Sequence, residues 1–349
     1  RRSSVYSFKN DYSETVHPNI LTAINNLGLK QNDGYGTDSY CEDAKKIILK
    51  VIECDNADVH FLPGGTITNL TFISHALRPY QAVISANTAH INIHETGAIE
   101  ACGHKILDIV TDDGKLTPEL IKPVLEQHEN EHWVQPKMVF ISNPTEIGTI
   151  YSKQEIQALY DFCRNQDLLL YLDGARLAMG ITAKESDIKF NDLPKMVDAF
   201  YIGGTKVGAL SGEALVLINE SLKNNFRFSM KQRGAILAKG WLLGLQFKEL
   251  FTDNLYLKLG KHTNDMAYLL QEIIAEKGFD FLAKVQSNQI FPIMPNWLID
   301  KISEQYLIST WSKPNEENTC VRFCTSWATS ESDIMAFKDF LTVVLKDRD

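Results

Sequence analysis

Short apolar runs alternate with amphipathic segments over about the first 220 residues, and this alternation restricts the fold more than any other feature of the chain. The apolar runs end at glycine, proline or asparagine, which is typical of buried strands that lead into turns. The intervening segments have helical spacing, as in Glu42–Ile52, where Ala44, Ile48 and Val51 share one face. Strands that alternate with helices predict an α/β fold with a mainly parallel sheet between layers of helices.

The expected elements follow in chain order. Strands are expected at Val59–Leu62, Ala82–Ser85, Lys105–Ile109, Lys137–Ile141, Leu168–Leu172, Met196–Ile202 and Ala214–Ile218. Helices are expected at Asn19–Leu27, Glu42–Ile52, Ile67–Leu77, Ile91–Glu100 and Lys153–Asn165. A further helix is expected after Thr117, with Thr117 as its N-cap and Pro118 as its first residue.

The pattern changes near residue 220. Two long helical stretches, Lys231–Leu250 and Leu255–Lys277, precede shorter segments and a closing helix at Glu331–Leu345. This change predicts a large domain over residues 1–250, which includes a polar N-terminal arm, and a smaller α+β domain over residues 251–349. A chain of 349 residues is long enough for both.

Charge and composition argue against several classes of partner. The net charge is −9 and the isoelectric point is near 5.5, which disfavours binding to nucleic acid or to an anionic membrane. No apolar run approaches the ~20 residues of a membrane span, and the basic start Arg1–Phe8 lacks the apolar core of a signal peptide. The six cysteines are scattered, which predicts reduced, mostly buried thiols in a cytoplasmic protein.

Gly64, Gly65 and Thr66 form the turn between the Val59–Leu62 strand and a helix. Free N–H groups and the helix dipole favour an anion there, glycine permits close approach, and Thr66 adds a hydroxyl. The pattern fits an ordinary strand-to-helix turn equally well. The chain has neither a Walker loop nor G-x-G-x-x-G, which argues against a nicotinamide cofactor.

Asp173-Gly174-Ala175-Arg176 directly follows the Leu168–Leu172 strand. An acidic side chain at the carboxyl end of a buried parallel strand lies where α/β folds bind ligands. A buried carboxylate requires a cationic partner. A protonated pyridine nitrogen is one candidate, and Arg176 is the other, in a pair that would close the turn.

His90 lies at a strand-to-helix junction, from which its imidazole could stack on a flat ring or satisfy a structural contact. His94 is four residues away, on the same face of a helix. Glu95 follows His94 directly, so the order H-E-x-x-H is absent and no metal is expected.

Lys206 follows Gly203, Gly204 and Thr205 at the end of an apolar run. Such a turn would direct the ammonium group into a cleft, where desolvation makes it an amine nucleophile suited to a Schiff base. A surface lysine on a glycine turn is the alternative.

Arg322 lies within the apolar strand Cys320–Cys324. It would bind a substrate carboxylate if its side chain faces inward, and it would be solvated if the side chain faces outward.

Together these patterns fit one chemistry. A phosphorylated pyridine aldehyde needs an anion site, a stacking ring, a carboxylate for its nitrogen and an amine for its aldehyde, and an amino-acid substrate needs an arginine. The chain therefore predicts pyridoxal 5'-phosphate as the cofactor, bound through Gly64-Gly65-Thr66, His90, Asp173 and Lys206, with Arg322 for the substrate.

Through a longer set of motifs, the chain resembles the threonine aldolase and β-eliminating lyase family of fold-type-I pyridoxal-phosphate enzymes. The branch it resembles most is that of the bacterial low-specificity L-threonine aldolases. The resemblance implies a fold-type-I, transferase-like fold. The motifs are Asn10-Asp11-Tyr12-Ser13, Tyr35-Gly36-Thr37-Asp38, Gly64-Gly65-Thr66 with Asn69, Thr88-Ala89-His90, the segment Asn143–Thr149, Asp173-Gly174-Ala175-Arg176, Gly203-Gly204-Thr205-Lys206, Lys231-Gln232-Arg233-Gly234 and the segment Arg322–Trp327.

The resemblance also implies a role for individual residues. Lys206 is similar to the Schiff-base lysine, Asp173 to the partner of the pyridine nitrogen, and His90 to the stacked histidine. Arg176 lies near the phenolic oxygen or the substrate carboxylate. The implied cofactor contacts are Gly64, Gly65, Thr66, His90, Asp173, Arg176, Thr205, Lys206, Lys231 and Arg233.

Arg322, Arg176 and Tyr35 are the substrate contacts that the resemblance implies. Lys231 and Arg233 match a basic segment that reaches a neighbouring subunit's site, which implies a homodimer or homotetramer with shared active sites.

The chain departs from the family at two places. Many members have Thr-His-Asn where this chain has Pro144-Thr145-Glu146, so a second active-site histidine is missing. The position of a serine that contributes to binding the substrate carboxylate is Lys9 or Asn10. Both departures bear on the substrate rather than on the cofactor.

The function implied is the cleavage of L-threonine, L-allo-threonine and other β-hydroxy-α-amino acids to glycine and an aldehyde, with His90 or an ordered water as the base for the β-hydroxyl. Three alternatives use different chemistry: β-elimination or racemisation of another amino acid, a non-catalytic relative that binds a partner, and a nicotinamide-dependent dehydrogenase.

Overall fold

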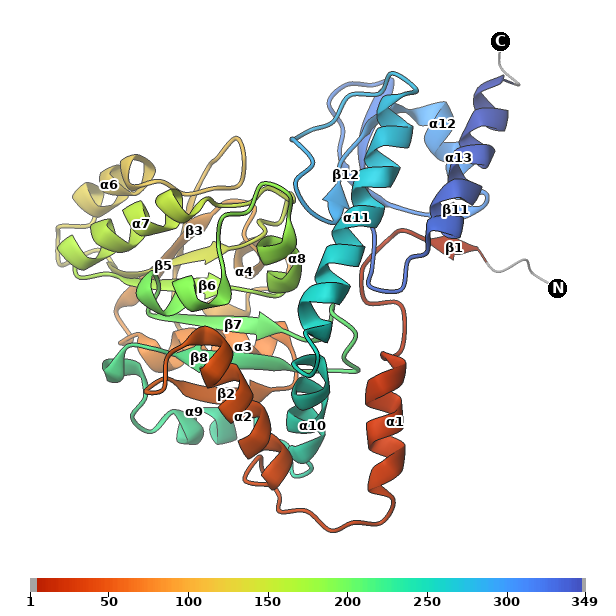
Figure 1. Cartoon of the computed structure of the whole chain (residues 1–349). Helices are drawn as coiled ribbons and strands as arrows, with labels where there is room; N and C mark the ends of the chain where they lie inside the picture. The colour runs from red at the N-terminus through yellow and green to blue at the C-terminus, as the bar shows by residue number, and fades with distance from the viewer. Residues whose placement is uncertain (1–4, 347–349) are drawn as a thin grey trace.

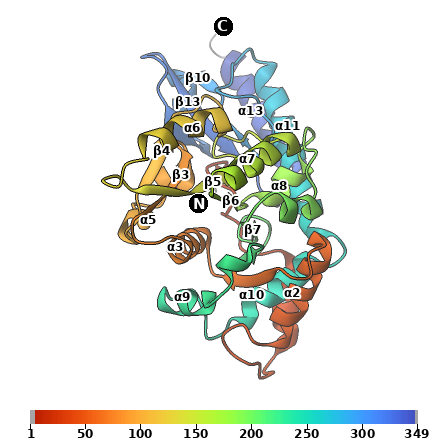
Figure 2. The same ribbon diagram turned by 90° about the vertical axis from the view of Figure 1, so that its left-hand side faces the viewer.

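The computed structural model describes residues 5–346, so the first four residues of the basic start lie outside it. Its large sheet lies between layers of helices, and a second, smaller α+β assembly packs beside it (Figures 1 and 2). The strands of the large sheet are β2 (Asp58–Leu62), β3 (Gln81–Ala86), β4 (Ile106–Ile109), β5 (Gln135–Ser142), β6 (Leu169–Asp173), β7 (Ala199–Gly203) and β8 (Glu213–Leu217).

The strand order in this sheet is β2-β8-β7-β6-β5-β3-β4. The neighbours from β7 to β4 pair in parallel, whereas β8 is antiparallel to both β2 and β7. The carboxyl ends of the parallel strands therefore meet at one edge, together with the amino end of β8. The predicted mainly parallel α/β sheet is confirmed.

Both faces of the sheet are apolar because helices cover both of them. Neighbouring residues of one strand belong to different apolar clusters, as expected for side chains that alternate between faces. Ile84 and Leu170 pack in the cluster on one face, and Val83 and Tyr171 pack in the cluster on the other.

Several of the helices that accompany this sheet begin with a side-chain cap. The Asp38 side chain accepts from the Cys41 N–H, Thr117 caps its helix as predicted, and Ser152 and Glu155 form a capping box. The helices are α1 (Pro18–Leu27), α2 (Ser39–Ile52), α3 (Gly65–Ala76), α4 (His90–Ile93), α5 (Ala98–Ala101), α6 (Pro118–Gln127), α7 (Lys153–Asn165), α8 (Leu177–Thr182), α9 (Phe226–Gln232) and α10 (Trp241–Leu250), with 3-10 turns η1 (Phe190–Lys195) and η2 (Glu220–Leu222).

Two predicted helices are wrong in extent. The segment Ile91–Glu100 is not one helix, because Thr96 and Gly97 have φ of 51° and 72° and separate α4 from α5. The stretch Lys231–Leu250 is likewise divided between the end of α9 and α10, with Gly234 at φ 73° after α9. A left-handed residue ends a helix, and glycine adopts that conformation without steric cost.

The C-terminal part has its own sheet and apolar cluster. The long helix α11 (Leu255–Ala275) leads into a sheet with the order β10-β13-β12, and β9 also pairs with β13. The remaining elements are β9 (Gln289–Ile290), β10 (Ile293–Pro295), α12 (Asn296–Ser303), β11 (Tyr306–Leu307), β12 (Ser309–Ser312), β13 (Asn318–Cys324) and α13 (Glu331–Lys346).

The N-terminal arm packs against these C-terminal elements, whereas the sequence analysis grouped it with the large domain. Strand β1 (Tyr6–Ser7) pairs in parallel with β11 (Figure 1), and Phe8 is buried in the cluster that contains Phe323 and Phe337. Burial of the Phe8 ring among aromatic side chains holds this otherwise polar arm against the C-terminal elements. The domain boundary near residue 250 stays a prediction.

Two further predictions from the sequence concern membrane-spanning segments and the cysteines. Within residues 5–346, no helix combines the length and the apolar character that crossing a membrane requires. All six cysteines are unpaired, and Cys41, Cys163, Cys320 and Cys324 are buried, which confirms the prediction of mostly buried thiols.

Candidate active site

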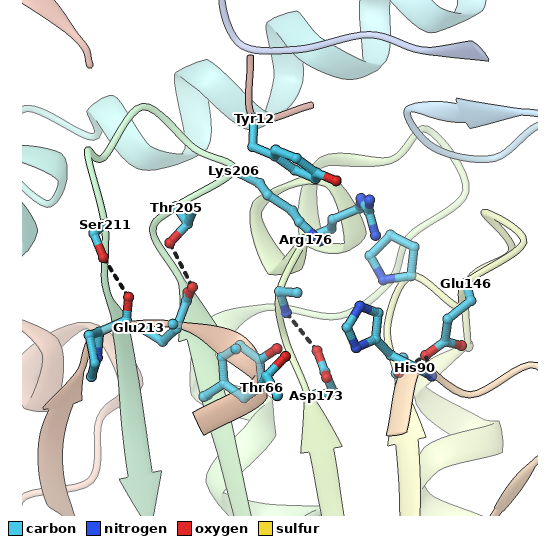
Figure 3. Close-up of a pocket in the computed structure, with 17 residues that line it drawn as sticks. Tyr12, Thr66, His90, Glu146, Asp173, Arg176, Thr205, Lys206, Ser211 and Glu213 are labelled. Carbon is cyan, nitrogen blue, oxygen red and sulfur yellow. Dashed lines mark hydrogen bonds between the residues drawn. The ribbon is translucent and has the colours of Figure 1, made fainter. Parts of the chain in front are cut away.

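A cavity of ≈ 240 Å³ lies at the sheet edge where the parallel strands end (Figure 3). Its walls come from the residues that follow β2, β3, β5, β6 and β7, from the amino end of β8, and from Tyr12 of the N-terminal arm. Gly64, Gly65, Thr66, His90, Asp173, Arg176, Thr205 and Lys206 are all among them. These predicted residues meet because each follows a strand of the same sheet.

Asp173 ends β6 at the floor of the cavity. The Asn69 amide donates to Oδ2 at 3.0 Å and the Ala175 N–H donates to Oδ1 at 2.9 Å, which holds the buried carboxylate in place. Among the described residues Asp173 forms no salt bridge, since Arg176 pairs elsewhere. A buried carboxylate that lines a cavity and has no salt-bridge partner among the described residues fits a protonated ring nitrogen from a ligand.

Arg176 pairs with Asp11, not with Asp173. Its Nε lies 2.6 Å from Asp11 Oδ2 and its Nη2 lies 3.1 Å from Oδ1, and the Asn288 amide donates to Oδ2 at 2.9 Å. Burial by itself raises the pKa of Asp11, but the charges of Arg176 and Lys206 outweigh it and hold the pKa well below its usual range. The arm residue Asp11 thereby fixes the guanidinium at the cavity wall.

Lys206 lies on the loop after β7, with its Nζ 5.9 Å from the centroid of the Tyr12 ring. It lines the cavity, so the alternative of a surface lysine is excluded. Burial, and then the charge of Arg176, lower the pKa of Lys206, although Asp11 and Asp173 act in the opposite direction. A lowered pKa increases the share of neutral amine, which is the nucleophilic form.

Thr205 and Glu213 form a polar pair beside Lys206. The Thr205 hydroxyl donates to Glu213 Oε1 at 2.8 Å, and the Gly204 N–H donates to Oε2 at 2.9 Å. The hydroxyl hydrogen of Thr205 is therefore used in a bond within the protein. Burial raises the pKa of Glu213 to about 7. Sequence reasoning missed Glu213, although an acidic residue inside the apolar run of β8 marked it.

His90 begins α4 and carries its ring between Asp173 and Glu146 (Figure 3). Its Nδ1 lies 2.7 Å from Glu95 Oε1, and Asn69 donates to that same oxygen at 2.9 Å. Asn69 therefore links the supports of His90 and Asp173. Sequence reasoning used Glu95 only to reject a metal motif, and no group of three His, Cys, Asp or Glu residues within 5–346 is suited to a metal ion.

Four predicted site residues lie away from the cavity of this chain. Arg322 is half-buried on β13, and its guanidinium donates to Gln289 Oε1 at 3.1 Å and to the Lys9 carbonyl at 3.0 Å. Tyr35 and Lys231 face a separate surface hollow, with Lys231 Nζ 4.6 Å from the Tyr35 ring centroid. Arg233 is exposed after the end of α9. Their roles stay predictions.

Gly174 follows Asp173, and Gly203 precedes the Lys206 turn. The backbone crosses itself so close to both positions that neither has room for a side chain. A Cβ on Gly174 would overlap the Tyr201 carbonyl oxygen, and a Cβ on Gly203 would overlap the Ala175 carbonyl oxygen. The Gly203 N–H donates to the Gly174 carbonyl at 2.9 Å across the same contact. The crossing sets the spacing between the ends of β6 and β7, and thus between Asp173 and Lys206.

Gly174→Ala is therefore expected to lower the free energy of unfolding by about 3 kcal/mol or more, because the backbone itself must move. Denaturant midpoints would measure the change. Gly64→Ala is the matched control, since a Cβ there meets nothing within 4 Å and φ is −172°, which any residue adopts. Equal midpoints for the two variants would contradict the crossing as the cause.

Comparisons with known proteins agree with this geometry. The beta-eliminating lyase family model matches residues 22–294. The solved structure of the threonine aldolase of Leishmania major is 44% identical and has a TM-score of 0.96, with 97% of this chain and 99% of that chain covered. The low-specificity L-threonine aldolase of Pseudomonas sp. (strain NCIMB 10558) is 29% identical, with 94% of each chain covered. That of Pseudomonas aeruginosa is 30% identical, with 81% of this chain and 83% of the relative covered. The expected fold-type-I architecture is confirmed.

Proposed function

Because the chain belongs to the beta-eliminating lyase family, we propose that it cleaves L-threonine, L-allo-threonine and related β-hydroxy-α-amino acids to glycine and an aldehyde. It is a pyridoxal-phosphate-dependent lyase, and the three relatives described above are named threonine aldolases. One observation carries the proposal: the same cavity is lined by Asp173 and by Lys206. Asp173 is a buried carboxylate with no salt-bridge partner among the described residues, and Lys206 is an amine whose pKa is lowered.

The residues present fit this cofactor. Asp173 would stabilise the positive charge on the ring nitrogen, His90 would contact the ring, and Lys206 would bond the aldehyde carbon. The first N–H groups of α3, at Gly65 and Thr66, are suited to the phosphate. When bound, the cofactor supplies a ring that withdraws the electron pair released at the substrate Cα.

The chain's own groups orient the substrate and handle protons. Arg176 keeps Nη1 available for a substrate carboxylate, because Asp11 occupies Nε and Nη2. Lys206 can hold or release a proton at Nζ because burial and Arg176 lower its pKa. Tyr12 lines the cavity next to Lys206 (Figure 3).

Oligomeric assembly belongs to the same proposal. The resemblance implies site roles for Tyr35, Lys231 and Arg233, which do not line the cavity of their own chain. The exposed Phe228 ring lines the hollow beside Tyr35 and Lys231. A homodimer or homotetramer would bring them to a neighbouring copy's site, and sedimentation would distinguish these states from a monomer. Six unpaired cysteines support a cytoplasmic location, which cell fractionation would test.

The test of the function is to incubate the protein and cofactor with L-threonine, L-allo-threonine, L-phenylserine and L-serine and to identify the products. Glycine with the matching aldehyde, benzaldehyde from L-phenylserine for example, is the expected result. A 2-oxo acid and ammonia in place of glycine would identify β-elimination instead. A protein whose spectrum ignores added cofactor would be a non-catalytic relative.

A further inference from the structure

The segment after β5 has Thr145 where many family members have a histidine and Glu146 where they have an asparagine, and it brings Glu146 to the cavity. Thr145 faces away from the cavity: its hydroxyl bonds the Thr149 hydroxyl at 2.6 Å, and its N–H donates to the Thr149 carbonyl at 2.8 Å. Glu146 lines the cavity. Of the three residues that depart from the family pattern here, Pro144 and Glu146 line the cavity, and only Glu146 brings an ionisable side chain to it.

The Glu146 carboxyl is held by two hydrogen bonds. The Ser142 hydroxyl donates to Oε1 at 2.6 Å and the His90 N–H donates to the same oxygen at 2.9 Å. Both bonds end on Oε1, which leaves Oε2 for a ligand. Figure 3 shows the side chain beside the His90 ring, on the side away from Glu213. A carboxyl fixed in this way loses little freedom when it accepts a proton from a bound substrate.

Several ionisable groups on neighbouring elements interact electrostatically with Glu146. Burial, and then the charge of Asp173 at the end of β6, raise the pKa of Glu146, while its hydrogen bonds from Ser142 and the His90 N–H lower it. Arg176, before α8, and the buried phenol of Tyr151 also lie within electrostatic reach. A carboxylate of raised pKa is a stronger base than an ordinary surface carboxylate.

His90 could act in the same role only through Nε2. Its Nδ1 is engaged by Glu95, whose side chain is fully buried. The role of His90 against a cofactor ring uses the face of the imidazole, whereas proton transfer needs a nitrogen at its edge. The fixed carboxyl next to it meets the requirement of a base with a free oxygen.

We propose that Glu146 is the catalytic base that takes the β-hydroxyl proton of the substrate. This assignment rests on the proposed function. The proton moves from the β-oxygen to Glu146 Oε2, the O–H electron pair becomes the second bond of the aldehyde carbonyl, and the Cα–Cβ pair moves to Cα. Protonation of Cα then yields glycine, so one proton leaves the substrate and one returns, and no further reactant is consumed.

Two reactions of one active site separate this role from a structural one. Exchange of the α-proton of glycine in D₂O, followed by NMR, needs the cofactor and the carboxylate site but no base for a β-hydroxyl. In Glu146→Gln, which can keep both hydrogen bonds on Oε1, kcat for cleavage is expected to fall roughly 10²-fold or more. Glycine exchange and the visible spectrum of the bound cofactor should stay within about threefold of wild type. Equal loss of both reactions, or loss of neither, would overturn the assignment.

Three further variants extend and control the test. Ser142→Ala removes a hydrogen bond that lowers the pKa of Glu146, so the acid limb of kcat/KM should shift to higher pH, and an unshifted limb would contradict the role. Glu146→Asp should retain part of the cleavage rate that the glutamine loses. Thr145→Val, at the neighbour that faces away from the cavity, should leave the ratio of cleavage to exchange unchanged. A changed ratio would assign the effect to the loop and not to the carboxyl.

The same assays separate failure of this assignment from failure of the proposed function. A wild-type protein that exchanges the glycine proton but forms no glycine from any β-hydroxy-α-amino acid would overturn the function, and the assignment with it. A wild type that cleaves, together with an unaffected Glu146→Gln, overturns the assignment alone.

Discussion

Lys206→Ala is expected to reduce cleavage by roughly 10⁴-fold or more, the scale on which enzymes lose activity with their nucleophile. Lys206 is the amine that lines the cavity next to Asp173 and Arg176, and burial with the charge of Arg176 lowers its pKa. The variant should also lose the visible absorption band that wild type shows with added cofactor. Both effects have one cause, which is the loss of the amine that bonds the aldehyde.

Two controls make this result specific. Lys206→Arg keeps a positive charge in the cavity but cannot supply a neutral amine, so it should be as inactive as the alanine variant. Lys122→Ala removes an equal charge from an exposed helix face, where Lys122 lies 4.0 Å from Glu126, and should behave as wild type. Cleavage by Lys206→Ala at the wild-type rate would exclude the mechanism.

Asp11→Ala should lower the free energy of unfolding by about 3–5 kcal/mol, because it leaves a buried guanidinium without its partner. The Asp11 side chain is 0% exposed and that of Arg176 is 12% exposed, so water replaces the lost carboxylate only in part. The lost ion pair lies where the N-terminal arm meets the cavity. The same change made at Asp43, whose ion pair with Lys248 is at the surface, should cost less than about 1 kcal/mol.

The Asp11 contribution should also depend on pH, with a definite sign. Its pKa in the folded protein is lowered, so its stabilisation is complete above the unfolded value of about 3.9 and is lost as the pH falls toward the folded value. The difference in stability between wild type and Asp11→Asn should therefore be largest near neutral pH and shrink below about pH 4. A difference that grows on acidification would contradict the ion pair as its source.

The residues that sequence reasoning identified share one property, which is their position directly after a strand. Thr66, His90, Asp173 and Lys206 each follow an apolar run, and parallel strands place such residues at a single edge. Their meeting could therefore be predicted without knowledge of any contact. The same local reasoning failed for the helix at Ile91–Glu100, because the left-handed turn at Thr96 lies in a polar segment without proline.

The partners of these residues were not predictable in the same way. Arg176 and its carboxylate Asp11 are 165 positions apart, and Asn69, which holds Asp173, is 104 positions from it. From the sequence alone, Asp173 was the nearer candidate for Arg176. Only the packing of the N-terminal arm against the C-terminal elements brings Asp11 to the guanidinium and leaves Asp173 for a ligand.

The sequence by itself determined the class of fold, the cofactor and the positions of the lysine and aspartate that meet it. Those features depend on the order of strands and turns, which is written in local patterns of apolar residues and glycine. The tertiary structure decided which carboxylate pairs with Arg176, which residue after Pro144 faces the cavity, and which predicted contacts lie outside it. These choices depend on contacts between distant segments, and local sequence patterns do not encode such contacts.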